Sequence, residues 1–240
     1  MAEPRRIAVV PALDEERAIA RVIAEIRAHD AGLEIVVVDD GSSDRTGEEA
    51  RAAGARVLRL PFNLGIGGAV QTGFRYAFEN GYDLAVRVDG DGQHDPAQLG
   101  AVVDPVLRGE ADIAVGSRYL SPAGGYRSSV PRRLGTRVLA WTVSLLTGQR
   151  ITDPTSGFQA LNRRALALFA ADYPHDYPEV EALVLLLRHR LRLREVPIEM
   201  RARTGGRSSI RTLSSGYYMV KVLLALFVGS FRRNVPLEEK

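Results

Sequence analysis

The sequence has 240 residues, 45% of them hydrophobic, which is enough to bury a full core and predicts a single catalytic unit. Its 32 Lys and Arg residues nearly balance its 29 Asp and Glu residues, and a net charge of +3 is too balanced for a general nucleic-acid binder, so we expect no nucleic-acid partner. The chain has no cysteine, which excludes disulfides, thiol catalysis and a cysteine-based zinc site.

The first half of the chain alternates strand and helix patterns. Residues 6–11 predict a buried strand, and the helix that follows has one apolar face, made of Ala18, Ile19, Val22, Ile23 and Ile26. Further strands are predicted at residues 34–39, 57–60, 84–89 and 113–116, and further helices begin at Asp44 or Thr46, at Gly68 and at Pro96. This alternation predicts an α/β fold in which a parallel sheet carries helices on both faces.

Polar residues follow three of these strands, at residues 11–15, 39–44 and 89–93. Ligands of such sheets bind beyond the carboxyl ends of the strands. We therefore expect the three polar segments to converge on one edge of the sheet and to form the functional site there.

The alternation fades after about residue 121. An apolar helix is predicted at residues 134–147 with Trp141 in the core, although its basic lead-in of Arg132, Arg133 and Arg137 also fits a helix at a membrane interface. A turn-rich stretch at residues 152–158, a helix at 180–190 and a strand at 193–198 follow.

The longest apolar run, residues 217–231, contains Lys221 and is shorter than the roughly 20 residues that a membrane-spanning helix needs. Arg232 and Arg233 directly follow this run. They favour a helix in the lipid headgroup region or against a membrane partner, and a core helix that covers the sheet is the alternative. The N-terminus lacks the apolar segment of a secretory signal, so we expect the catalytic part to be cytoplasmic.

The most informative segment is Asp89-Gly90-Asp91-Gly92-Gln93, which puts two carboxylates and an amide on a tight turn at a strand end. Hard cations such as Mg²⁺ or Mn²⁺ take oxygen ligands, and Mg²⁺ is commonly shared between one or two carboxylates and substrate phosphates. The alternative is a surface turn rich in Asp and Gly. We expect His94 to support this turn rather than to bind the cation, because oxygen-rich sites suit hard cations better than imidazole.

Asp39 ends a second predicted strand and can accept hydrogen bonds from a base or a ribose hydroxyl, whereas Asp44 is interpreted as a helix cap. The glycines at residues 65–68 lack the dinucleotide-binding spacing, and no phosphate-binding loop ending in Gly-Lys-Ser/Thr is present. Dehydrogenase and nucleoside-triphosphatase functions are therefore weak hypotheses.

Together these segments resemble the inverting glycosyltransferases of family two, particularly the branch of dolichyl-phosphate mannose synthases and related polyprenyl-phosphate glycosyltransferases. The resemblance runs along nearly the whole chain in six ordered motifs, which makes it far more specific than any one of them. The motifs are Pro-Ala-Leu-Asp-Glu-Glu at 11–16, Val-Asp-Asp-Gly-Ser-Ser-Asp at 38–44, Asn-Leu-Gly with Gly-Gly-Ala within 63–69, Asp-Gly-Asp-Gly-Gln-His at 89–94, Gly-Ser-Arg at 116–118 and Asp-Pro-Thr-Ser-Gly-Phe at 153–158.

The resemblance implies a role for each matching residue. Asp89, Asp91 and Gln93 would bind the metal or the diphosphate, with Asp91 also counted as catalytic. Arg118 and one of Arg132 and Arg133 would face the acceptor phosphate as catalytic residues. The implied donor-binding residues are Pro11, Ala12, Leu13, Glu15, Asp39, Asp89, Gly90, Arg203 and Ser208, with Leu13 where an aromatic often packs on the base and Arg203 and Ser208 in a basic loop that closes over the donor.

The implied fold is the A-type glycosyltransferase fold, a Rossmann-like, mostly parallel sheet flanked by helices, with a C-terminal apolar or amphipathic helix. On this basis residues 1–210 form the catalytic domain, with a nucleotide-sugar-binding half at 1–120 and an acceptor-side half at 121–210. Residues 211–240 would form a membrane-interfacial or docking helix.

The implied function is transfer of a sugar, with inversion, from a GDP- or UDP-sugar to a polyprenyl or dolichyl phosphate at the cytoplasmic membrane face. The cofactor would be Mg²⁺ or Mn²⁺, and the protein would be cytoplasmic and peripherally associated with the membrane surface or with a small membrane-protein partner. A lipid phosphate is already mostly anionic near neutral pH, because its second pKa is about 6, so it needs no general base.

Alternative functions remain open at this point. A family-two transferase that acts on a hydroxyl in polysaccharide or glycan synthesis would need a base, for which Asp153, Glu179 and Glu181 are the candidates. A catalytically silent nucleotide-sugar-binding or membrane-scaffolding protein would not need the intact metal motif. A sugar nucleotidyltransferase would have a glycine-rich, basic N-terminal loop, whereas residues 11–16 are acidic.

Overall fold

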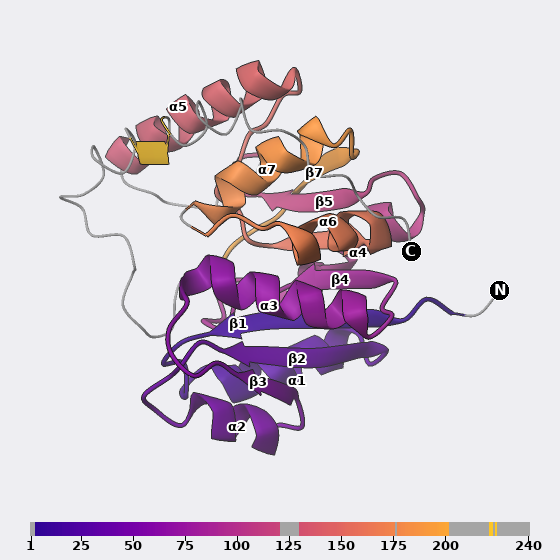
Figure 1. Ribbon diagram of the computed structural model, residues 1–240, viewed down its shortest axis with the longest axis vertical. Helices are drawn as coiled ribbons and strands as arrows, with labels where there is room; N and C mark the ends of the chain where they lie inside the picture. The colour runs from indigo at the N-terminus through magenta and orange to yellow at the C-terminus, as the bar shows by residue number, and fades with distance from the viewer. Residues whose placement is uncertain (1–2, 121–129, 176, 202–220, 223, 225–240) are drawn as a thin grey trace.

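The computed structural model describes residues 3–120, 130–175, 177–201, 221–222 and 224, and these residues form a layered α/β domain around one sheet (Figure 1). In the described chain the sheet has seven strands in the order β3-β2-β1-β4-β6-β5-β7. The strands are β1 (Arg6–Ala12), β2 (Leu33–Asp39), β3 (Arg56–Arg59), β4 (Leu84–Arg87), β5 (Ile113–Ser117), β6 (Gln159–Asn162) and β7 (Leu193–Pro197). All neighbours pair in parallel except β6, which runs antiparallel to both β4 and β5.

Helices cover both faces of the sheet, as the sequence predicts (Figure 1). Side chains of α1 (Ile19–His29), α2 (Thr46–Ala52) and α4 (Leu99–Leu107) pack on one face. Those of α3 (Gly65–Glu79), α5 (Val130–Thr147), α6 (Arg163–Ala171) and α7 (Pro178–Arg188) pack on the other.

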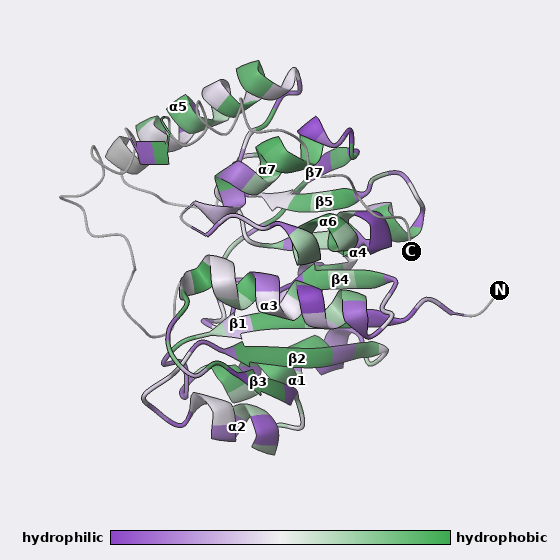
Figure 2. Cartoon of the chain, in the orientation of Figure 1, coloured by the Kyte–Doolittle hydropathy of each residue, from purple (hydrophilic) through white to green (hydrophobic). Residues whose placement is uncertain are grey.

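The central strand β1 shows why this sheet is buried on both sides. Ile7 and Val9 point into the core under α3, and Ala8 and Val10 point into the core over α1, with exposed fractions of 1% or less. A strand with apolar residues at every position buries both faces only between two helical layers. Figure 2 shows the same pattern as hydrophobic colouring along β1, β2 and β4.

Several predicted elements begin or end at other residues. The helix expected from Pro96 starts as a 3-10 turn, η1 (Pro96–Gln98), before α4 begins, and β4 ends at Arg87 rather than at residue 89. The short strand β6 and the helix α6 were not predicted. Trp141 was predicted to be in the core, and this is wrong: its side chain on α5 is 68% exposed.

No helix in the described part of the chain is long and apolar enough to cross a membrane. The apolar run at residues 217–231 lies outside the described residues apart from Lys221, Val222 and Leu224. Val222 is fully buried and belongs to the same core cluster as Leu139 and Val143 of α5.

Candidate active site

Three polar segments lie at neighbouring positions along the carboxyl edge of the sheet, as predicted. Ala12 pairs with Asp39 at the ends of β1 and β2, and the Asp40 amide donates to the Ala12 carbonyl at 2.9 Å. On the other side of β1, the Gly90 amide donates to the Pro11 carbonyl at 3.2 Å. The end of β1 is therefore bonded to both acidic segments.

The loop after β1 is locked to the loop after β2. Asp14 has a φ of 54°, and Asp is one of the few residues that adopts this left-handed conformation readily. Its carboxylate accepts from the Ser43 amide at 2.8 Å, and its own amide donates to Ser42 Oγ at 3.1 Å. The Glu15 amide donates to Thr46 Oγ1 at 2.8 Å. Leu13, next to this turn, keeps 40% of its surface exposed at the site.

The two aspartates at the end of β2 are buried and bond to the surrounding backbone. Asp39 is 1% exposed, accepts from the Ser42 amide at 2.9 Å and lies 3.7 Å from Arg59 Nε. Asp40 accepts from the Leu64 amide at 2.7 Å and so joins the second motif to the third. Burial raises the pKa of Asp40, against the lowering effect of the Leu64 amide.

Asp44 was interpreted as the cap of α2, but the N-cap position is Arg45, and Asp44 bonds to the first turn from one residue earlier. Its carboxylate accepts from the Thr46 amide at 2.9 Å and from the Glu16 amide at 3.1 Å. Burial alone would raise the pKa of Asp44, but the hydrogen bonds from Thr46 and Glu16 outweigh it and the pKa is lowered.

The metal motif is a tight turn after β4. Gly92 has a φ of 76°, and a side chain on Gly90 would come within 3.1 Å of the Pro11 carbonyl, so both positions suit glycine. Asp91 is 8% exposed and accepts from the Gln93 amide at 3.0 Å, and Asp89 is 30% exposed. Among the described residues no group of three or more His, Asp or Glu side chains could hold a metal ion. Two carboxylates and the Gln93 side-chain amide are the oxygen groups predicted to bind the cation, and their role as ligands stays a prediction.

The buried side chain of His94 supports this turn through a hydrogen bond to its backbone. It is 2% exposed, stacks on Phe158 with ring centroids 5.0 Å apart, and its Nδ1 accepts from the Asp89 amide at 3.0 Å. Burial lowers the pKa of His94, which favours the neutral ring with the proton on Nε2. The geometry agrees with a supporting role rather than a metal-binding one.

A buried arginine beside the metal motif was missed from the sequence. Arg87 ends β4 and is 2% exposed; its Nε donates to Asp89 Oδ1 at 2.9 Å, and its Nη1 lies 3.0 Å from Glu179 Oε1 on α7. Burial by itself would lower the pKa of Arg87, but the Asp89 and Glu179 carboxylates outweigh it and the pKa is raised. A charged residue inside an otherwise apolar strand was the available signal.

Arg118, directly after β5, forms a bidentate ion pair with Asp153. Its Nε and Nη2 donate to the two Asp153 oxygens, each at 2.6 Å, and Nη2 also donates to Thr155 Oγ1 at 2.6 Å. Arg118 is 8% exposed and Asp153 is fully buried. The role of Arg118 toward an acceptor phosphate therefore stays a prediction, because two of its nitrogens already serve Asp153.

Glu195 of β7 supports the same turn. It accepts from the Thr152 and Asp153 amides, each at 2.8 Å, and burial raises the pKa of Glu195.

The remaining predicted site residues are only partly described. Arg133 lies exposed on α5, whereas Arg203, Ser208 and the side chain of Arg132 lie outside the described residues. The chain after β7 returns to the metal motif, where the Arg201 amide donates to the Gln93 carbonyl at 3.0 Å.

The comparisons with known proteins agree with this geometry. The sequence profile of the family described as Glycosyl transferase family 2 matches residues 7–169, which is more than half of the chain. The chain belongs to this family. It is a glycosyltransferase, and the resemblance drawn from its motifs is confirmed.

Two curated relatives have names that include their acceptors. The chain is 32% identical over 228 residues to the polyprenol monophosphomannose synthase of Mycolicibacterium smegmatis, a match that covers 91% of this chain and 85% of the relative. It is 30% identical over 218 residues to the UDP-N-acetylglucosamine–dolichyl-phosphate N-acetylglucosaminyltransferase of Methanococcus voltae, with 83% and 86% covered.

A solved structure confirms the fold. Glucosyl-3-phosphoglycerate synthase from Mycobacterium tuberculosis, in complex with Mn²⁺ and UDP-glucose, is similar with a TM-score of 0.72 at 26% identity, covering 95% of this chain and 79% of that chain. The predicted A-type glycosyltransferase fold, with its mostly parallel sheet flanked by helices, is therefore confirmed.

Proposed function

We propose that this glycosyltransferase moves a sugar, with inversion, from a GDP- or UDP-sugar to a polyprenyl or dolichyl phosphate. Relatives that are about a third identical over most of the chain are named for polyprenyl or dolichyl phosphate acceptors. The structural observation that carries the proposal is that two of the three carboxylates that could act as a general base are already ion-paired. A hydroxyl acceptor needs such a base, whereas a phosphate acceptor does not.

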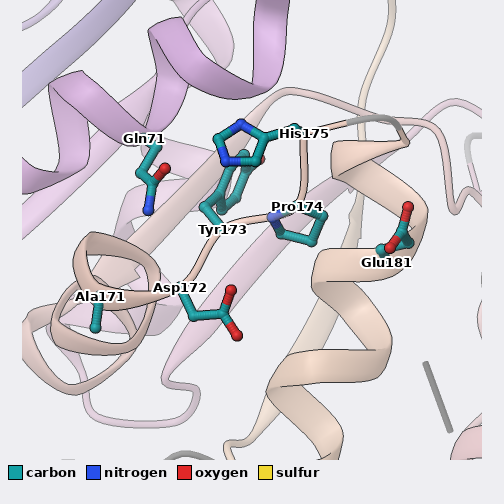
Figure 3. A pocket seen from close by; sticks show the side chains of 7 residues that line it. All are labelled: Gln71, Ala171, Asp172, Tyr173, Pro174, His175 and Glu181. Carbon is teal, nitrogen blue, oxygen red and sulfur yellow. The ribbon is translucent and has the colours of Figure 1, made fainter. Parts of the chain in front are cut away.

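Two of the three candidate bases are held by arginines. Both oxygens of Asp153 accept from Arg118, and Glu179 is paired with Arg87, so removal of an acceptor proton would have to break a buried ion pair. Glu181 lines a cavity of about 370 Å³ between α3, α7 and the connection from α6 to α7 (Figure 3). The other lining residues are Gln71, Ala171, Asp172, Tyr173, Pro174 and His175, and none belongs to the strand-end loops.

The chemistry of the metal motif fits a hard divalent cation. Asp89, Asp91 and Gln93 would hold Mg²⁺ or Mn²⁺, which when bound stabilises the negative charge of the departing nucleoside diphosphate. The glycines at 90 and 92 let the backbone approach the diphosphate, and the buried His94 keeps the turn in place through the Asp89 amide.

The donor would lie across the loops after β1 and β2. Pro11, Ala12, Leu13 and Glu15 would hold the nucleotide, with the exposed face of Leu13 against the base. Asp39 would accept from a base or ribose hydroxyl; its 1% exposure requires the ligand to reach into the loop. The acceptor phosphate would meet Arg118 together with Arg132 or Arg133, and Arg203 and Ser208 would close over the diphosphate.

The site would work at a membrane surface. Four apolar side chains on α5 recur on one helical face and are exposed: Leu134 (63%), Val138 (38%), Trp141 (68%) and Leu145 (67%). Arg133 and Arg137 are exposed on the same helix, and residues 130–147 contain no Asp or Glu. An apolar stripe with an aromatic residue and flanking cations suits the headgroup region of an anionic bilayer.

The domain limits follow from this proposal. Residues 1–120 would bind the nucleotide sugar, residues 121–210 would complete the acceptor side, and residues 211–240 would form a helix at the membrane or against a small membrane-protein partner. This last segment lies outside the described residues except for Lys221, Val222 and Leu224.

The decisive test is transfer of radiolabelled sugar from a panel of nucleotide sugars to short-chain polyprenyl phosphate with Mg²⁺ or Mn²⁺. We expect metal-dependent transfer by the wild type, a loss of at least about 100-fold in Asp91→Ala, and normal transfer by Asp104→Ala, which removes an exposed carboxylate on α4. A wild type that hydrolyses the donor but labels only hydroxyl acceptors would disprove the phosphate acceptor.

A further inference from the structure

Arg87 is the largest fully buried side chain in the described chain, and it lies where three segments meet. It ends β4, two residues before Asp89. Its Nη1 is paired with Glu179 at the start of α7. A Cβ added to Gly157, in the turn after Asp153, would lie 2.7 Å from Arg87 Nη2, so the backbone of that turn packs against the guanidinium.

A buried guanidinium is costly unless it is paired, and apolar residues of similar volume often replace such pairs without loss of stability. Packing alone therefore does not require an arginine here. An apolar residue could not hold the Asp89 carboxylate. Arg87 does so, because its Nε donates to Asp89 Oδ1 at 2.9 Å.

We propose that Arg87 is a positioning residue for Asp89: it fixes the rotation of this carboxylate, which would help to hold the cation. Glu179 holds the other end of Arg87 and thereby ties the acceptor-side helix α7 to the metal motif. This inference rests on the metal dependence in the proposed function.

The sign of one measurement separates positioning from simple charge. If Arg87 acted only as a nearby positive charge, its removal would strengthen the binding of a divalent cation. If it positions Asp89, its removal weakens binding, by about 10- to 100-fold as is typical when a partner of a metal ligand is lost. The two effects have opposite directions.

The experiment measures Mn²⁺ binding by electron paramagnetic resonance, with a fixed concentration of UDP or GDP and a protein-free titration as baseline. We expect Arg87→Gln to bind Mn²⁺ at least about tenfold more weakly than the wild type, and Arg87→Lys to recover part of the loss. Glu179→Gln, which keeps Arg87 and Asp89, should give a smaller loss.

Two further variants guard against a folding effect. Val86→Ala removes two buried methyl groups from the residue before Arg87 on β4 and should leave Mn²⁺ affinity unchanged. The double variant Arg87→Met, Glu179→Leu replaces the ion pair with apolar groups; it should fold, as judged by circular dichroism, and still bind Mn²⁺ weakly.

The outcomes distinguish this inference from the proposed function. Unchanged or stronger Mn²⁺ binding in Arg87→Gln or in the folded double variant overturns the positioning role alone. An equal loss in Val86→Ala also overturns it, because packing would then explain the effect. A wild type that binds no Mn²⁺ overturns the proposed metal dependence, and this inference with it.

Discussion

The site has a proposed donor side, the loops after β1 and β2, and a proposed acceptor side, the turn that contains Arg118 and Asp153. The two are held together in different ways. On the donor side, many single hydrogen bonds join neighbouring loops, such as Asp14 to Ser43 and Asp40 to Leu64. On the acceptor side, one buried ion pair joins Arg118 to Asp153, 35 residues further along the chain. Removal of one donor-side bond leaves the other loop bonds in place, whereas removal of one partner of a buried ion pair leaves an uncompensated buried charge.

The largest effect should come from breaking the acceptor-side pair. Asp153→Asn removes the charge that compensates Arg118, and we expect the free energy of unfolding to fall by about 3–5 kcal/mol because the guanidinium stays charged and buried. Urea unfolding followed by circular dichroism measures this. Asp104→Asn, which breaks an exposed pair with Arg108, is the control and should leave stability unchanged. Equal stability of the two variants would contradict the comparison.

This contrast also explains what the sequence could predict. The donor-side motifs are contiguous and follow strands with a clear apolar pattern, so their convergence on one edge was predicted from residues 6–93. The tight turn at residues 89–93 and the bond from Asp44 to the start of α2 have local signals for the same reason, because each depends on neighbours a few residues away.

The acceptor side was predicted less well, because its contacts are distant in sequence. Strand β6 has only four residues and is followed at once by Arg163 and Arg164, which hides its pattern, and its place between β4 and β5 follows from pairing alone. The Arg118–Asp153 pair has no local signal. Trp141 was predicted to be buried since apolar residues surround it, but on α5 it belongs to the exposed stripe.

The next effect concerns that stripe. Trp141→Gln should weaken binding to vesicles of phosphatidylcholine and phosphatidylglycerol by about tenfold or more, because burying a large apolar side chain contributes about 1.5–3 kcal/mol. Leu145→Gln should act similarly. Co-sedimentation with vesicles is the measurement, and transfer to a water-soluble short-chain acceptor should be unchanged.

A matched control for the stripe is Leu107→Gln. Leu107 is 44% exposed at the end of α4, a helix that packs on the other face of the sheet from α5. The Leu107→Gln variant should bind vesicles as tightly as the wild type does. If Trp141→Gln also binds normally, the membrane surface is not α5. If vesicles without anionic lipid bind as well as those with it, the exposed arginines of α5 do not contribute to binding.

A smaller effect is expected on the donor side at Asp14, whose φ is 54°. Asp14→Gly keeps the left-handed backbone but loses the bonds to Ser43, whereas Asp14→Ala loses both. We therefore expect Asp14→Ala to be less stable than Asp14→Gly by about 1 kcal/mol. Urea unfolding of both variants measures the difference. Equal stability of the two variants would mean that the loop can change its backbone conformation at residue 14 at no cost.

The smallest effect is a pH dependence at Asp40. Because burial raises the pKa of Asp40, the folded protein holds the proton more tightly than the unfolded chain, whose Asp pKa is about 3.9. The folded state therefore loses stability as pH rises from there through the raised pKa. Asp40→Asn keeps an acceptor oxygen for the Leu64 amide and does not ionise, so its stability relative to wild type should improve as pH rises from about 4 through the raised pKa. Urea unfolding of both proteins at each pH cancels the titration of other groups. If the difference in free energy of unfolding between the two proteins stays constant with pH, the hydrogen bond from the Leu64 amide and the neighbouring loop bonds fully compensate the burial of the charged carboxylate.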